Sequence, residues 1–108
     1  MGRPNVGKST LVNALCGGKV AIVSDKPQTT RRAIRGVVTA PNRFQLVLTD
    51  LPGVQRPRDA LTHRMQARVE REVAEDDAVL FVLNGQEGIG PGDRWIAGVL
   101  GRVEVPVV

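Results

Sequence analysis

The chain has 108 residues, of which 42% are hydrophobic and 24% charged, and it carries a formal net charge of +4. This composition is that of a globular domain, and the apolar runs at 44–49 and 78–83 are far too short to span a bilayer. The single cysteine, Cys16, excludes an internal disulfide. With only one cysteine and one histidine in the chain, a zinc site is implausible.

The first motif of the chain fits the phosphate-binding pattern G-x-x-x-x-G-K-[ST], with the residues Gly2, Arg3, Pro4, Asn5, Val6, Gly7, Lys8 and Ser9. Glycines let such a loop curl so that backbone N–H groups surround a phosphate. In this pattern Lys8 reaches the β- and γ-phosphates, and Ser9 offers its hydroxyl to Mg²⁺. These residues, together with Thr10, form the first part of the expected nucleotide-binding site.

A helix is predicted from Lys8 to Cys16, ended by Gly17-Gly18. Residues 19–32 then have no clear apolar period and are interpreted as a first switch loop. A threonine on a mobile loop can complete Mg²⁺ coordination when a γ-phosphate is present. Thr30 is the first choice for this role and Thr29 the second, and the alternative is a basic solvated loop. The switch residues are Gln28, Thr29, Thr30, Arg31 and Arg32.

Residues 33–40 and 43–50 are predicted to be paired strands joined by a turn at Pro41-Asn42. The second strand ends in the motif D-x-x-G, formed by Asp50, Leu51, Pro52 and Gly53. A carboxylate at the end of such a strand lies where open α/β folds bind ligands. We therefore expect Asp50 to hold a water on Mg²⁺ and the Gly53 N–H to meet a γ-phosphate.

The rest of the chain alternates between strand and helix patterns. Residues 51–60 are interpreted as a second switch, 61–74 and 92–101 as amphipathic helices, and 78–83 as a strand buried on both faces. Trp95 is expected to pack in the core, and His63 to be solvated. Alternating elements of this kind predict an α/β fold with a mostly parallel sheet.

Three strings carry a family resemblance: Gly-Arg-Pro-Asn-Val-Gly-Lys-Ser-Thr-Leu-Val-Asn-Ala-Leu at the start, Pro-Gln-Thr-Thr-Arg in the middle, and Thr-Asp-Leu-Pro-Gly-Val after it. Together they resemble the GTPase domain of the Era family, bacterial ribosome-assembly GTPases of the TrmE–Era–EngA group. The middle string favours this family over its relatives, and Gly90-Pro91-Gly92-Asp93-Arg94 is also similar to it. The resemblance covers essentially all of residues 1–108.

The resemblance implies a P-loop NTPase fold, a three-layer sandwich, in a cytoplasmic and monomeric GTPase that uses Mg²⁺ and converts GTP to GDP. It implies a switch that acts in maturation of the small ribosomal subunit and its 16S rRNA. In the family, a C-terminal KH domain contacts this RNA, and the full protein is also expected to associate peripherally with membranes. The net positive charge suits a protein that works near RNA. The densest basic patch of the first half, Arg31, Arg32 and Arg35, is interpreted as a solvated loop and strand edge, and the alternative is direct contact with RNA.

We expect residues 1–108 to be a partial GTPase domain, incomplete at both ends. Only Met1 precedes the P-loop, where a buried strand is usual, and neither an Asn-Lys-x-Asp motif nor a KH domain occurs in the sequence. Guanine preference is therefore implied by the resemblance alone. Missing strand partners leave backbone groups unpaired, so this chain is expected to be unstable or aggregation-prone in isolation.

The expected reaction is phosphoryl transfer from GTP to water, with Lys8, Thr30, Asp50 and Gly53 as the catalytic set. The group that orients the water is open, since Val54 stands where Ras-type enzymes have glutamine, and Gln55 and Gln28 are alternatives. Hydrolysis is expected to be slow and to need a trigger. Two other interpretations remain: a nucleotide-binding checkpoint without turnover, and a P-loop ATPase or kinase.

Overall fold

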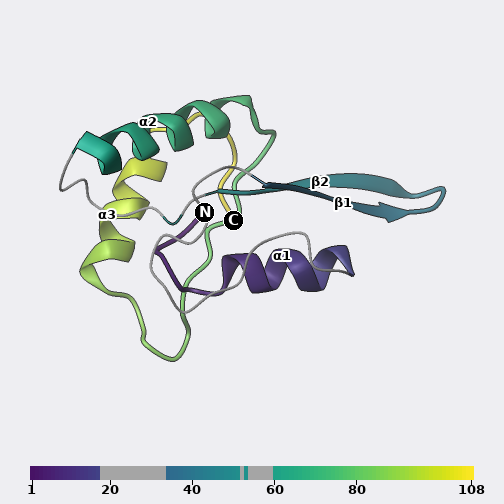
Figure 1. The fold of residues 1–108 in the computed structure, drawn as a ribbon, viewed down its shortest axis with the longest axis horizontal. Coiled ribbons are helices and arrows are strands. Elements are labelled where there is room, and N and C mark those ends of the chain that lie inside the picture. Colours follow the sequence, from purple (N-terminus) through teal and green to yellow (C-terminus); the bar gives the residue numbers. More distant parts are fainter. Residues whose placement is uncertain (18–33, 52, 54–59) are drawn as a thin grey trace.

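The structure, a computed structural model, describes residues 1–17, 34–51, 53 and 60–108 (Figure 1). In chain order, the described elements are helix α1 (Lys8–Cys16), strands β1 (Ile34–Ala40) and β2 (Phe44–Asp50), and helices α2 (Ala60–Glu75) and α3 (Pro91–Leu100). Each lies within a residue or two of its predicted bounds. The prediction of two paired strands between the first and second helices is confirmed.

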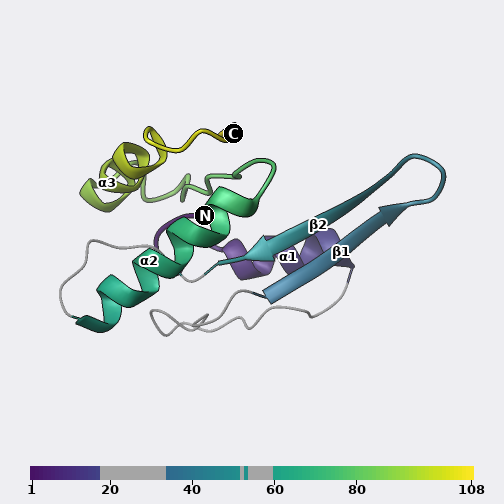
Figure 2. The same ribbon diagram turned by 90° about the horizontal axis from the view of Figure 1, so that it is seen from above.

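Helix α1 begins and ends where the sequence predicts. It starts directly after Gly7 and ends at Gly17, whose φ of 69° is left-handed and whose N–H reaches the Ala14 carbonyl. Glycine adopts this conformation without the steric cost that a Cβ brings. The helix packs against the β1–β2 hairpin, and both views show it running alongside the strands (Figures 1 and 2).

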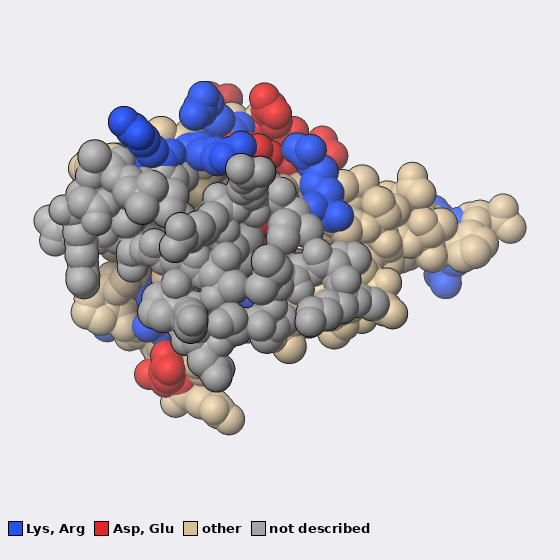
Figure 3. Space-filling view, in the orientation of Figure 1, with Lys and Arg blue, Asp and Glu red and all other residues tan. Residues whose placement is uncertain are grey.

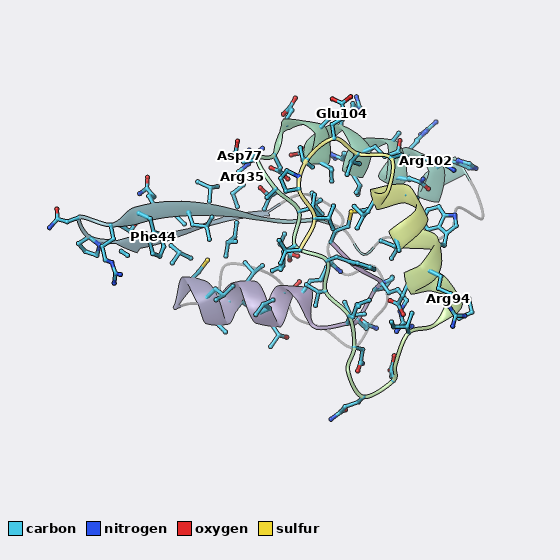
Figure 4. The ribbon with its side chains drawn as sticks, turned by 180° about the vertical axis from the view of Figure 1, so that it is seen from behind. Arg35, Phe44, Asp77, Arg94, Arg102 and Glu104 are labelled. Carbon is cyan, nitrogen blue, oxygen red and sulfur yellow. The ribbon has the colours of Figure 1, made fainter. Side chains whose placement is uncertain are left out.

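The two strands form an antiparallel hairpin that projects from the rest of the molecule (Figure 2). Pairing runs from Ile34 opposite Asp50 to Ala40 opposite Phe44, and the turn at 41–43 is closed by the Arg43 N–H on the Ala40 carbonyl at 3.0 Å. Asn42 has a φ of 58°, which asparagine tolerates better than most residues. Phe44 lies near the turn, at the far end of the hairpin (Figure 4). Burial increases along β2 from exposed Phe44 to buried Asp50 at the other end.

The buried core lies at the opposite end of the molecule from the hairpin tip. It joins residues of α2 and α3 with two residues outside the helices: Val69, Val73, Ile96, Leu100, Val79 and Leu51. Trp95 is partly buried against this cluster, which agrees with its predicted packing role, and His63 is exposed as predicted. Burial of these side chains is the main apolar contribution to stability in the described residues.

The predicted strand at 78–83 is wrong in its extent. Val79 alone forms a bridge, a parallel one to Val107, and both Leu80 and Leu83 are more than two-fifths exposed instead of buried. The backbone is nonetheless paired on both sides, because the N–H groups of Phe81 and Val82 bond to the carbonyls of Val108 and Met1. Among the described residues, the backbone partners of this segment are Met1, Pro106 and Val108, and its side chains at Leu80 and Leu83 stay partly uncovered.

The predicted mostly parallel sheet is therefore not seen in the described residues, whose one sheet is the antiparallel hairpin. What the structure does have is a small sheet combined with helices, in the manner of a partial α/β unit. None of the helices in the described ranges has the length and apolar character needed to cross a membrane.

Charged side chains gather over α2 (Figure 3). Exposed arginines lie along the first part of this helix, and acidic residues lie toward its C-terminal end. One of them, Glu72, accepts a hydrogen bond from Arg35 of β1 at 3.3 Å, which ties the base of the hairpin to α2. The Arg35 side chain is largely exposed, so the pair is screened by solvent and contributes little to stability.

Candidate functional site

The loop before α1 has the backbone conformation that phosphate-binding loops need. Asn5 and Gly7 have φ values of 60° and 100°, both left-handed. The helix then begins at Lys8, and the Leu11 N–H bonds to the Gly7 carbonyl at 2.9 Å. Alternation of left-handed and right-handed residues just before a helix produces an anion-binding concavity, and the helix N-terminus adds a partial positive charge.

Lys8 is buried beneath this loop. Only 9% of the residue is exposed, and its Nζ donates a hydrogen bond to the Arg3 carbonyl at 3.2 Å. Burial lowers the pKa of the Lys8 ammonium, and the Asp50 carboxylate opposes this shift. An ammonium held in the loop by one carbonyl is placed to exchange that carbonyl for a phosphate oxygen.

Ser9 and Asp50 meet although they are 41 positions apart in the sequence. The Ser9 Oγ donates a hydrogen bond to the Asp50 Oδ2 at 2.7 Å, and Asp50 is 2% exposed. Antiparallel pairing with β1 positions Asp50 at the inner end of β2. The serine of the first motif and the aspartate of the second motif therefore form one polar centre.

The donor set at this centre fits a magnesium ion. Among the described residues, no donor reaches the buried Asp50 Oδ1, which is an unusual state for a carboxylate oxygen. Mg²⁺ prefers oxygen ligands and commonly uses one or two protein oxygens with several waters. The Ser9 hydroxyl and the Asp50 carboxylate are ligands of this kind.

Gly53 lies against the phosphate-binding loop. A Cβ built on Gly53 would be 2.7 Å from the Pro4 Cα and 2.8 Å from the Pro4 nitrogen, so no larger residue fits. Leu51, two residues earlier, is buried in the core. The second motif thus brings one residue to the core, one to Ser9 and one to the loop backbone.

Several predicted site residues lie outside the described residues. These are the first-switch residues Gln28, Thr29, Thr30, Arg31 and Arg32, and in the second switch Pro52, Val54 and Gln55. Thr10 is exposed on α1, next to Ser9. No group of three or more potential metal-ligating His, Cys, Asp or Glu side chains is found within the described parts of the chain.

Sequence reasoning missed the partners of Arg3. The Arg3 Nε donates to the Asp93 Oδ1 at 2.7 Å, and a terminal nitrogen of the guanidinium lies 3.2 Å from the Glu87 Oε2. The Arg3 side chain is thus bound to the loop before α3 and to that helix. A helix-start signal at Gly90-Pro91-Gly92-Asp93 was available, but nothing local in the sequence indicates a partner 90 residues away.

The family comparison agrees with this geometry. The family described as "50S ribosome-binding GTPase" matches residues 1–108. The chain belongs to this family of GTPases. The resemblance to Era is confirmed by curated relatives: the chain is 55% identical over 96 residues to GTPase Era of Leifsonia xyli subsp. xyli (strain CTCB07). It is 53% identical over 96 residues to GTPase Era of Mycobacterium tuberculosis (strain ATCC 25618 / H37Rv).

Solved structures give the same result for the fold. One is a crystal structure of Era in complex with MgGDPNP and nucleotides of 16S ribosomal RNA, and another is a variant of Aquifex aeolicus Era bound to GDP and AlF4⁻. Each matches 99% of this chain with a TM-score of 0.91 and 40% identity. The chain has the fold of the corresponding part of these GTPases.

The match covers only a part of each relative. It includes 89% of this chain but 32% of each of the two curated relatives, and 36% of each solved chain. The chain therefore spans about a third of the length of the proteins it resembles.

Proposed function

We propose that the chain is the GTP-binding and GTP-hydrolysing part of a molecular switch, with residues 1–108 forming a partial Era-type GTPase domain. The observation that carries this proposal is the 2.7 Å hydrogen bond between Ser9 and Asp50. A serine at the start of a P-loop helix and the aspartate of a D-x-x-G motif are needed together at one metal ion. If the D-x-x-G motif were only a turn without a ligand, nothing would require Asp50 to contact Ser9.

In the proposed site, Mg²⁺ is held by Ser9, by Asp50 through a water, and by Thr30 when the triphosphate is bound. An Mg²⁺ ion held there would supply positive charge that neutralises the β- and γ-phosphates. Lys8 and the backbone N–H groups of residues 2–10, except Pro4, would bind the phosphates, and the Gly53 N–H would meet the γ-phosphate. We propose the same set as nucleotide-binding residues: Gly2, Arg3, Pro4, Asn5, Val6, Gly7, Lys8, Ser9, Thr10, Asp50, Leu51, Pro52 and Gly53.

We further propose that the whole protein acts in small-subunit maturation and binds 16S rRNA through a KH domain. Two comparisons support this proposal: the match to GTPase Era of Leifsonia xyli, and the match to the Era structure that contains MgGDPNP and 16S ribosomal RNA. A mostly parallel sheet around the 79–82 segment, a cytoplasmic location, a monomeric state and a peripheral membrane association complete the proposal. The parallel bridge between Val79 and Val107 supports the sheet.

The experiment uses a chimera in which residues 1–108 replace the matching segment of the Leifsonia GTPase Era. Multiple-turnover phosphate release from Mg·GTP is measured with and without small ribosomal subunits, beside a Lys8→Ala control. We expect slow release that exceeds the control and increases with subunits.

The second candidate is a nucleotide-binding checkpoint without turnover, favoured by Val54 at the position of the usual glutamine. Tight Mg·GDP binding together with release no faster than the Lys8→Ala control, in both conditions, would support the checkpoint and contradict the enzyme. Preference for Mg·ADP over Mg·GDP would contradict both.

A further inference from the structure

Arg3 belongs to the phosphate-binding loop, yet its side chain is bound to another part of the molecule. Its Nε donates to the Asp93 Oδ1 at 2.7 Å, and its NH2 group donates to Glu87 at 3.2 Å. The two partners differ in their surroundings, because the Asp93 side chain is 1% exposed and that of Glu87 is 64% exposed. Asp93 is therefore the stronger anchor, since a buried charged pair is screened far less by solvent.

Asp93 is itself held in one position. Its Oδ2 accepts the Gly90 N–H at 2.8 Å, which caps the start of α3, while its Oδ1 faces Arg3. Burial opposes the charge, yet the Gly90 N–H and the Arg3 guanidinium hold the pKa of the Asp93 carboxyl below its ordinary value. Both oxygens are thus used by groups from different parts of the chain.

Gly92 makes room for the Arg3 side chain. A Cβ on Gly92 would lie 2.8 Å from the Arg3 Cδ and 3.4 Å from its Cγ. The segment Gly90-Pro91-Gly92-Asp93 thereby combines a helix start with a seat for the arginine: Pro91 is the first helical residue, Asp93 supplies the cap, and Gly92 admits the stem.

The backbone of Arg3 connects this anchor to Lys8. The Arg3 carbonyl accepts the hydrogen bond from the Lys8 Nζ at 3.2 Å. The order of contacts is therefore Asp93 to the Arg3 side chain, and the Arg3 carbonyl to the lysine that the proposed function places on the phosphates. A movement of Arg3 would displace the group that holds this ammonium.

We propose that Asp93 is a positioning residue for the phosphate-binding loop, acting through Arg3 on the placement of Lys8. Helix α3 and the loop before it thus set the shape of a site that they do not line. The proposal rests on the proposed nucleotide binding at residues 2–10. It also assigns a role to the Gly-Pro-Gly-Asp segment, which the nucleotide site alone does not explain.

The test measures Mg·GDP and GMP affinities of the chimera defined above, by competition with a fluorescent GDP. Asp93→Ala and Arg3→Ala should each weaken Mg·GDP binding about tenfold, since each removes a hydrogen bond between charged groups. The double variant should lose no more than either single variant, because both changes break one contact. Glu87→Ala, which removes the exposed partner, is the matched control and should stay within about twofold.

GMP separates positioning from a structural role. GMP lacks the β-phosphate that Lys8 reaches, so GMP affinity should stay within about twofold in the Asp93→Ala variant. Equal loss of Mg·GDP and GMP would mean that Asp93 only supports the fold and would overturn the proposal. So would unchanged Mg·GDP binding in Arg3→Ala. Absence of Mg·GDP binding in the unmodified chimera would overturn the proposed function together with this inference.

Discussion

The half of the molecule that contains α2 and α3 buries its apolar side chains, whereas the β1–β2 hairpin leaves most of its own in solvent. Ile96 of α3 is fully buried, but Val47 of β2 is 54% exposed and Phe44 is 56% exposed. Both halves are regular, and in the hairpin backbone hydrogen bonding and β-propensity define the geometry with only α1 packed alongside. The core half supplies the apolar burial.

The candidate site lies where the two halves meet. Asp50 ends the hairpin and Leu51, the next residue, is in the core. The Asp50 carboxylate is thus at the inner end of a largely exposed strand and is fixed by the buried core residue that follows it. Substitutions in the core should therefore disturb the site, while substitutions on the hairpin faces should not.

The largest expected effect is in the core. Ile96→Ala should cost about 2–5 kcal/mol of the free energy of unfolding, because it leaves a cavity in the packed cluster. Urea unfolding of the 108-residue chain can be followed by the fluorescence of Trp95, its single tryptophan, which packs on this cluster. Loss of the folded signal in the variant but not in the unsubstituted chain would agree with this cost, whereas an unfolding curve for Ile96→Ala identical to that of the unsubstituted chain would contradict the assignment of the core.

The second-largest expected effect is that of pH on the stability of the 108-residue chain, and it tests the contact between Met1 and Leu80. The Met1 ammonium donates to the Leu80 carbonyl, and burial, with repulsion from Lys8, lowers its pKa from 8.0 to about 6. Between these values the unfolded chain binds more protons than the folded chain, so stability should rise with pH from about 6 to 8, by at most about 2.7 kcal/mol. Urea midpoints measured at half-unit steps check this, and a flat profile would mean that the amine is solvated.

The third-largest expected effect is at Gly53, which lies against the phosphate-binding loop where the two halves meet. Gly53→Ala would place a Cβ against Pro4, and such overpacking should cost about 1–3 kcal/mol and weaken Mg·GDP binding. Gly85→Ala is the matched control, because nothing lies within 4 Å of a Cβ there, and it should change stability by less than about 1 kcal/mol. Equal behaviour of the two variants in urea unfolding would mean that Gly53 does not contact the loop.

The smallest effect should be on the hairpin. Val47→Ala removes a side chain that is already half in solvent, so the free energy of unfolding should change by less than about 0.5 kcal/mol. The comparison of Val47→Ala with Ile96→Ala by the Trp95 signal then measures the difference between the halves. A loss at Val47 as large as that at Ile96 would show that the hairpin face is covered in solution.

Local signals in the sequence predicted the local structure well. Gly17 ends α1 in a left-handed conformation, and Asn42 adopts one in the hairpin turn, both consequences of what these residues tolerate. The predicted buried strand at 78–83 failed because burial depends on neighbours that no local pattern describes. The backbone of this segment does pair with Met1, Pro106 and Val108, but these partners reach only some of its residues.

The candidate site was predictable to the same degree. Ser9 and Asp50 were each assigned to the metal from motif chemistry, and the structure brings them together. The contact between Arg3 and Asp93 was not predicted, because it joins residues 90 positions apart and uses the arginine in a way that the motif does not specify. Motifs indicate which groups contact a ligand but not which groups hold those groups in place.

The central claim is that Ser9 and Asp50 together serve a magnesium ion next to the γ-phosphate. The most direct test is calorimetric titration of the chimera and its Asp50→Asn variant with Mg·GDP and with Mg²⁺ and a non-hydrolysable GTP analogue. The substitution should weaken binding of the triphosphate about tenfold more than binding of the diphosphate, since the charged group that holds a metal-bound water near the γ-phosphate is lost. Equal losses for both nucleotides would contradict a metal role for Asp50.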